Sequence, residues 1–262
     1  MKKFLAVLLA LTLVFAMAAC GDDTVDPVDT DPATTTTPAT PDTTTEPVED
    51  TTEPADTTEP VEGVMSYDEY VAAELDTEVV VAVYVQATQS WWEDKITVYA
   101  ADEDGAYFIY EMACSEEDAA LLVPGTKIVV TGYKSEWSGE VEIVDATFEF
   151  AGDDTYVAEA VDVTDLLGTD ELIDYQNQLV VFNGLTVKSI EFKNDGGDDI
   201  YVTVTKDDVD YNFCIEVYLT GTETEVYQTA SNLKAGDMIN VEGFAYWYEG
   251  INTHITAIEA AK

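Results

Sequence analysis

The sequence contains no arginine, one histidine and only ten basic residues, all lysine, against 54 acidic residues, for a formal net charge of -44 over 262 residues. Nucleic-acid binding depends largely on Lys and Arg displacing the counterions condensed on phosphates, so this balance predicts that nucleic acid is not a partner. A lone histidine, His254, cannot supply a multi-histidine metal site, and we expect it to be exposed on the last strand. The missing arginine also argues against a nuclease, which would use it to stabilise a phosphoryl transition state.

Cysteine is scarce too, with three residues at positions 20, 114 and 214 and no Cys-x-x-Cys motif. Cys114 and Cys214 are expected to be free and buried, and a disulfide between them is the alternative that an exported chain permits. No motif points to a cofactor, and none is predicted.

The N-terminus has the pattern of an export signal over residues 1–19. Two lysines precede an apolar run from Phe4 to Ala19, which at 16 residues is shorter than the ~20 residues that span a bilayer. The segment Met17-Ala-Ala-Cys20-Gly21 resembles the lipobox of bacterial lipoproteins. That resemblance implies cleavage before Cys20, diacylation of Cys20 and a protein anchored to the outside of a bacterial cell membrane, facing the cell wall or the exterior. An ordinary secretory signal is the alternative.

Residues 20–62 form a second compositional region, rich in Thr, Pro, Asp and Glu. After Cys20 this region holds seven of the eight prolines and 13 acidic residues but no basic one. Such a segment cannot bury a core, and its near-repeats Asp50-Thr-Thr-Glu-Pro54 and Asp56-Thr-Thr-Glu-Pro60 are typical of an extended, disordered spacer.

The rest of the chain carries an internal repeat. Gly125-Thr-Lys-Ile-Val-Val-Thr-Gly132 matches Gly236-Asp-Met-Ile-Asn-Val-Glu-Gly243 at an offset of 111 residues. The repeat predicts two similar modules, over residues 63–151 and 152–262.

Each module is predicted to contain five strands with a short helix between the third and the fourth. In the first module the strands are expected over 78–87, 95–101, 106–112, 127–134 and 140–148, with Ser115 as N-cap of the helix. In the second, a helix is expected over 163–175, strands over 178–192, 199–206, 211–218, 237–246 and 253–259, and the inserted helix over 224–233. This order, with Gly-x-x-Ile-x-Val-x-Gly on strand four, resembles the OB-fold, and the whole chain resembles bacterial lipoproteins with tandem OB-like domains. The resemblance implies a mainly β protein of two tandem five-stranded barrels after a disordered linker.

Aromatic residues cluster in the predicted loops, where OB-folds bind oligonucleotides and oligosaccharides. Trp91 and Trp92 fall between strands one and two of the first module, and Trp137 falls between strands four and five. Tyr246, Trp247 and Tyr248 occupy the corresponding loop of the second module. With nucleic acid excluded, these residues are the candidate ligand-binding set for an extracellular glycan or a protein partner. Packing of the same rings over the barrel ends is the alternative.

The acidic turns Asp102-Glu-Asp-Gly105 and Asn194-Asp-Gly-Gly-Asp-Asp199 favour turn chemistry, with weak calcium binding as the alternative. No catalytic constellation can be picked out, so the sequence leaves open whether the protein is an enzyme and favours one that is not. Three hypotheses follow: a lipid-anchored binding module for a glycan or protein, a structural component that contacts only proteins, and an extracytoplasmic hydrolase.

Overall fold

The computed structural model describes residues 63–194 and 197–261. The expected signal peptide, the lipidation site Cys20 and the spacer up to residue 62 therefore lie outside the described residues.

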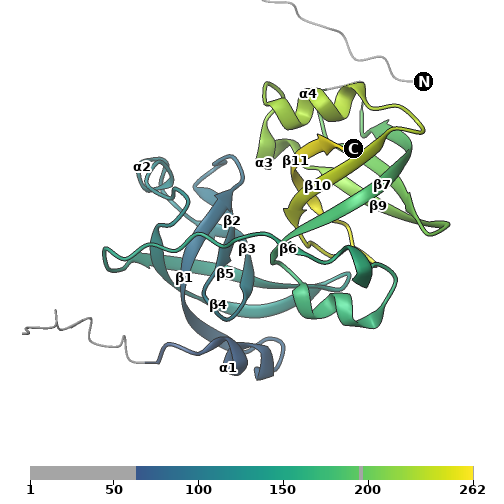
Figure 1. The fold of residues 1–262 in the computed structure, drawn as a ribbon. Coiled ribbons are helices and arrows are strands. Elements are labelled where there is room, and N and C mark those ends of the chain that lie inside the picture. Colours follow the sequence, from purple (N-terminus) through teal and green to yellow (C-terminus); the bar gives the residue numbers. More distant parts are fainter. Residues whose placement is uncertain (1–62, 195–196, 262) are drawn as a thin grey trace, which may run out of the picture. The chain divides into compact units, whose positions relative to one another are not determined.

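Residues 78–150 form a closed five-stranded barrel, called barrel A here (Figure 1). Its strands are β1 (Glu78–Thr88), β2 (Lys95–Ala101), β3 (Ala106–Ala113), β4 (Lys127–Trp137) and β5 (Glu140–Phe150), paired in the order β1-β2-β3-β5-β4 and closed by β1 with β4. Helix α1 (Tyr67–Ala72) precedes the barrel, and α2 (Glu116–Ala119) lies between β3 and β4. This confirms the predicted mainly β fold, the first barrel and its inserted helix.

The local sequence explains these elements. Along β1 every second residue from Val79 to Val85 is fully buried, as alternation on a half-buried strand requires. Helix α1 begins at a capping box, in which Ser66 and Glu69 each accept from the other's backbone N–H. Ser115 caps α2 by accepting from Asp118 N.

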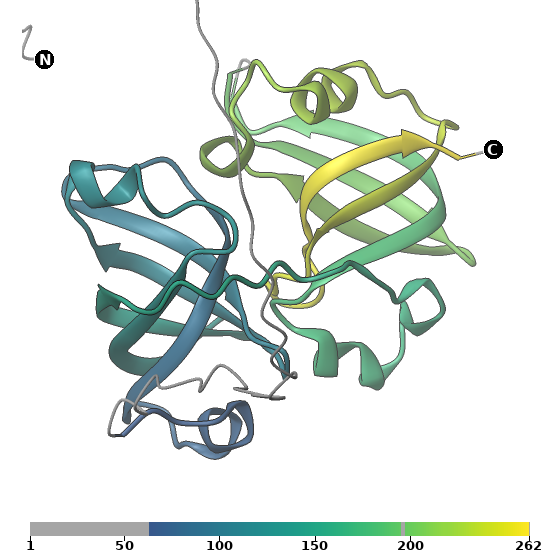
Figure 2. The ribbon, with the colours of Figure 1, turned by 60° about the vertical axis from the view of Figure 1, so that its left-hand side comes forward.

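The second half of the chain forms a six-stranded sheet, called sheet B here. Its order is β10-β11-β9-β8-β7-β6, and β10 also pairs with β7. The strands are β6 (Val161–Asp162), β7 (Leu179–Phe192), β8 (Ile200–Lys206), β9 (Val209–Ile215), β10 (Met238–Phe244) and β11 (His254–Ala260). Between β9 and β10 lie α3 (Val217–Thr220) and α4 (Glu225–Asn232), and α4 packs on the core of this sheet through Val226, Tyr227 and Ala230. Residues 151–160 have no strand pairing and connect barrel A with sheet B (Figure 2).

Sheet B departs from the sequence prediction at three places. The helix expected over 163–175 is two 3-10 helices, η1 (Thr164–Leu166) and η2 (Asp170–Tyr175), separated by Gly168 at a φ of 82°. Strand β6 was not predicted. The strand expected to run to Tyr218 ends at Ile215, and Tyr218 belongs to α3.

The two copies of the glycine motif have the same structural role. Gly125 and Gly236 adopt positive φ angles of 89° and 94°, which only glycine tolerates readily. Gly132 and Gly243 sit where the strand register shifts, and an added Cβ would lie 2.9 Å from Val144 O and 2.3 Å from His254 O. The motif therefore specifies turns and close strand crossings, and it carries no ligand chemistry.

Barrel A and sheet B lie within one compact unit of the chain, each with its own apolar core. A third buried cluster joins them, formed by Tyr99 and Phe108 of barrel A and Phe244 of sheet B. Tyr99 and Phe244 stack with ring centroids 4.4 Å apart. Because this cluster covers the outer face of β2, that strand is buried on both faces after its first residue instead of alternating.

Candidate functional site

The loop between β1 and β2 ends in a tight hairpin that presents Trp92. Trp92 and Lys95 exchange two backbone hydrogen bonds of 3.0 Å, and the residues between them, Glu93 and Asp94, have φ angles of 48° and 63°. Positive φ at both central residues is typical of a type I′ turn, whose twist matches that of antiparallel strands. The turn leaves the Trp92 side chain 70% exposed.

A bulge in β3 lies beside this hairpin. The register between β2 and β3 shifts after Ile96, so that Tyr110 and Glu111 together face Thr97. Glu111 has a φ of 45°, and its N–H donates to Thr97 Oγ1 over 3.1 Å. Bulges are frequent beside functional sites, where they re-aim a side chain, and here both Tyr110 and Glu111 are exposed.

Tyr218 comes from sheet B, on the short helix α3. Its carbonyl oxygen accepts hydrogen bonds from Ser90 N at 2.7 Å and from Ser90 Oγ at 3.2 Å. This bond joins α3 to the β1–β2 loop across 128 residues of sequence, and the Tyr218 ring remains 60% exposed.

These three aromatic side chains line one cleft of about 360 Å³, called the aromatic cleft here. Its other lining residues are Gln89, Ser90, Lys95, Ile96, Thr97 and Glu111. The cleft therefore lies over β2, β3 and the loop before β2, the face that OB-folds use for ligands. Exposed aromatic side chains that converge on a single hollow are unusual unless they meet a ligand or partner.

The charges in the aromatic cleft balance locally. Lys95 Nζ lies 2.6 Å from Glu111 Oε2, and the Tyr110 hydroxyl donates to Glu111 Oε1 at 3.0 Å. The hydrogen bond from Lys95 lowers the pKa of Glu111, and the same bond raises the pKa of Lys95. Lys95 is thus paired with Glu111, and among the described residues that line the cleft no other cation is present beside its aromatic surface.

The residues singled out in the sequence do not form one site. Trp92 lines the aromatic cleft, whereas Trp91 is half-buried and donates from Nε1 to Cys114 O at 2.8 Å. Trp137 and Tyr248 are exposed and pair with each other, with ring centroids 5.1 Å apart, but neither lines the cleft.

The other two aromatic residues of the second loop serve packing between barrel A and sheet B. Tyr246 stacks on His254 at 4.1 Å and meets Phe108 edge to face at 5.2 Å. Trp247 packs against the core of sheet B, and its backbone N–H donates to Glu140 Oε2 at 2.7 Å.

The contact between barrel A and sheet B also buries polar groups. His254 is only 8% exposed, so its expected place on an exposed strand face is wrong; Tyr246 covers it, and the Tyr99 hydroxyl lies 2.6 Å from its Nδ1. Burial lowers the pKa of His254 to about 3. Glu140 is fully buried, and burial raises its pKa to about 8.

The remaining candidate groups act structurally in the described residues. Cys114 and Cys214 are buried and free, as expected, and burial raises the pKa of both thiols. Asp102 accepts from the backbone N–H groups of Asp104 and Gly105, as turn chemistry predicts. Within residues 63–194 and 197–261 no three His, Cys, Asp or Glu side chains gather as a metal site. No helix in the same ranges is both long and apolar enough to cross a bilayer.

No protein-family model and no curated protein matches the chain. Among solved structures, it is similar to a murine DNA-binding protein bound with double-stranded DNA, at 11% identity and a TM-score of 0.34, over 70% of this chain and 96% of that one. The HINa domain of Ifi202 in complex with 20-bp double-stranded DNA gives 13% identity and a TM-score of 0.33, over 72% and 97%. A variant of the single-stranded DNA binding protein from Thermus aquaticus gives 13% and 0.25, over 71% and 94%.

These comparisons correct two expectations from the sequence. The similar proteins named above are described as binding DNA, which runs against a glycan-binding or protein-binding module and against the exclusion of nucleic acid as a partner. At TM-scores of 0.25 to 0.34 the likeness does not itself argue for a ligand of this chain. The ligand class has to be argued from the aromatic cleft.

Proposed function

We propose that the aromatic cleft binds a nucleobase, either of a free nucleoside or of a single-stranded nucleic acid. The observation that carries the proposal is the convergence of Trp92, Tyr110 and Tyr218, each more than 40% exposed, on one hollow over β2 and β3. Every base has a flat face that stacks on aromatic rings, and one such contact is worth about 1–3 kcal/mol in proteins that bind single strands. A hollow of about 360 Å³ is within the range of small-ligand sites.

The charge distribution restricts how such a ligand is held. From residue 63 onward the chain has 8 lysines against 41 acidic residues, and Lys95, the cleft's lysine, is paired with Glu111. Phosphate groups therefore gain little from the protein, so binding energy comes from the base ring while the phosphates face solvent.

The proposal is tested by calorimetric titration of the chain with adenosine, with thymidine and with short single-stranded oligo(dA) and oligo(dT). Trp92→Ala removes the most exposed ring of the cleft and is expected to weaken binding by roughly five- to 150-fold, the equivalent of about 1–3 kcal/mol. Trp137→Ala is the matched control, because it removes another exposed tryptophan outside the cleft and should leave binding unchanged.

The probes also separate the two sources of the base. Binding of nucleosides as tightly as oligonucleotides indicates a free-base ligand, and binding of oligonucleotides alone indicates a single-stranded polymer. No binding of any of the four probes, or equal loss in both tryptophan variants, contradicts the proposal.

We also propose that sheet B is a second OB-like barrel, so that the chain holds two such modules in tandem over residues 63–151 and 152–262. The proposal is supported by the pairing of β10 with β7, by α4 between β9 and β10, and by the matching geometry of Gly132 and Gly243. Limited proteolysis near Gly152 tests it: two fragments that each remain folded are expected, and rapid loss of either one argues against independent modules.

For cellular location we propose lipid anchoring through Cys20, supported by the sequence Met17-Ala-Ala-Cys20-Gly21 and the apolar run before it. A tethered protein of this kind would meet nucleosides or nucleic acid outside the cytoplasm.

A further inference from the structure

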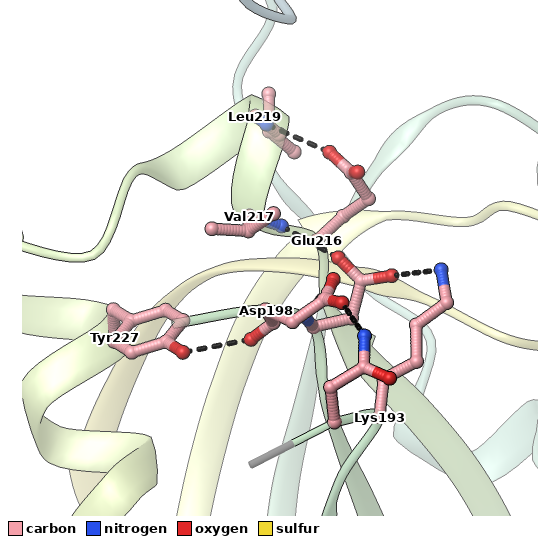
Figure 3. A network of polar contacts seen from close by, with 8 residues as sticks. Lys193, Asp198, Glu216, Val217, Leu219 and Tyr227 are labelled. Atoms are coloured by element: carbon pink, nitrogen blue, oxygen red, sulfur yellow. Dashed lines mark hydrogen bonds and ion pairs between the residues drawn. The ribbon is translucent and has the colours of Figure 1, made fainter. Parts of the chain in front are cut away.

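A network of polar contacts surrounds the start of α3, the helix that carries Tyr218 (Figure 3). Glu216 Oε2 accepts from Leu219 N at 2.7 Å, and Asp199 Oδ1 accepts from Val217 N at 2.9 Å. Two carboxylates thus bind the backbone N–H groups on either side of Tyr218.

The network also includes Lys193, which directly follows β7, and Tyr227 of α4. Lys193 Nζ lies 3.0 Å from Asp199 Oδ2, and Asp199 N donates to Asp198 Oδ1 at 2.8 Å. The Tyr227 hydroxyl on α4 donates to Asp198 O at 2.7 Å, as Figure 3 shows. Asp199 is 5% exposed and Glu216 is 9% exposed, so both carboxylates are held inside the protein rather than on a solvated turn.

We infer that Glu216 and Asp199 are positioning residues for the aromatic cleft: they fix α3 so that Tyr218 forms one wall and its carbonyl stays bonded to Ser90. Neither carboxylate lines the cleft, so both act through Tyr218. The inference rests on the proposed function only in taking the cleft as the ligand site; the bond between Ser90 and Tyr218 can be observed without any ligand.

Glu216 makes the fixing of α3 sensitive to pH. Burial, and then the nearby charge of Asp199, raise the pKa of Glu216 to about 7, while hydrogen bonds from Leu219 and Tyr218 oppose the rise. The titratable groups that interact with it from the surrounding elements are Asp199, Lys193, Cys214 of β9 and Tyr99 of β2. Asp198 lies next to Asp199, and His254 lies beyond Tyr99. Among these, Lys193 favours the ionised form of Glu216, and it is shared with Asp199.

The direction of the pH effect on opening of α3 follows from the difference between the two pKa values of Glu216. A carboxyl with a raised pKa in the closed network binds its proton more tightly there than when an opening exposes it to water at its ordinary value of 4.5. Opening of α3 therefore becomes easier as pH rises from about 4.5 to about 7, and little changes above that. Between pH 6 and pH 8 the protection of the Ser90 amide, corrected for intrinsic exchange, is expected to fall roughly tenfold.

The experiment measures hydrogen exchange of the Ser90 amide by NMR, together with adenosine affinity, in the full chain. Glu216→Ala is expected to lower Ser90 protection and weaken adenosine binding several-fold. Glu216→Gln keeps an acceptor for Leu219 and should restore binding, but it should lose the tenfold dependence on pH. Glu223→Gln, an exposed carboxylate just after α3, is the control and should behave as the unmodified chain.

The outcomes separate this inference from the proposed function. Loss of Ser90 protection in Glu216→Ala, with no binding of adenosine, thymidine, oligo(dA) or oligo(dT) by any chain, supports the positioning role and overturns the nucleobase proposal. Unchanged Ser90 protection in Glu216→Ala, or a pH dependence that persists in Glu216→Gln, overturns the positioning role even where adenosine binds.

Discussion

Replacement of Glu140 by glutamine should remove a large part of the pH dependence of folding stability. Glu140 begins β5 and is fully buried. Its Oε2 accepts from Trp247 N at 2.7 Å and from Gln176 Nε2 at 3.4 Å, while Oε1 has no hydrogen-bond partner within residues 63–194 and 197–261. Burial raises the pKa of this carboxyl to about 8 from an ordinary value of 4.5. The carboxyl is therefore mostly protonated in the folded protein at neutral pH.

The size and sign of the effect follow from that difference. The folded chain holds the proton of Glu140 more tightly than the unfolded chain, so this contribution to stability is present below about pH 4.5 and is lost as pH rises through about 8. With these two values the loss is about 4 kcal/mol between pH 5 and pH 9, of which about 1.4 kcal/mol falls above pH 7. The Glu140→Gln chain cannot titrate at this position, so its stability should fall by that much less over the same range.

Urea denaturation at pH 5, 7 and 9 and constant ionic strength measures the difference. The free energy at a single pH is not the readout, since the new amide group leaves a buried donor to satisfy, which costs about 1–3 kcal/mol. Glu149→Gln, an exposed carboxylate on the same strand, should keep the full dependence. Parallel curves for the unmodified chain and Glu140→Gln would refute the reasoning.

Two further predictions concern the hairpin and the anchor. Replacing Glu93 with Asn and Asp94 with Gly should preserve the turn that carries Trp92 and raise stability by about 0.5–1 kcal/mol, because these residues tolerate positive φ better; the melting temperature measures it, and a lower value contradicts it. Cys20→Ser should abolish labelling with a radioactive fatty acid and release the protein into the medium, because both acyl chains are lost; membrane retention of the variant would contradict lipid anchoring.

The sequence was sufficient for barrel A because its signals are local. Alternating valines define β1, and Ser115 is read directly as a helix cap. The single helix predicted over residues 163–175 is wrong because Gly168, at positive φ, interrupts a segment whose flanking residues suit a helix. The end of β9 was misplaced although Glu216 and Gly221 bracket α3 as cap residues, a signal that was available in the sequence.

The aromatic cleft was only partly predictable because it depends on contacts between distant segments. Trp92 was identified from its loop, but Tyr110 becomes prominent only through the bulge at Glu111, and Tyr218 reaches the cleft through a bond to Ser90. His254 is buried for the same kind of reason, since Tyr246 of the β10–β11 loop and Tyr99 of β2 cover it. Periodicity along one strand reports the face of a side chain and does not report which other element covers that face.

The negative charge of the chain is expected to weaken binding of the phosphate group of a nucleotide and to leave stacking of the base unaffected. On the proposed function, a base stacked on Trp92 would meet neutral aromatic surface, whereas a phosphate beside the hairpin would approach Glu93 and Asp94, the two residues after Trp92. At about 10 Å in water each pair of like unit charges costs about 0.4 kcal/mol, so a dianionic phosphate near two carboxylates, which makes four such pairs, loses up to about 15-fold in affinity. Adenosine should therefore bind more tightly than adenosine monophosphate in dilute buffer. At 1 M salt, where the Debye length is about 3 Å, the affinities for adenosine and adenosine monophosphate should converge.

Proteins that bind phosphates with lysine and arginine show the opposite trend, because salt weakens their binding. Affinity for the monophosphate that falls with added salt would thus mean that the ligand is held by its phosphate, and the base-stacking proposal would be wrong.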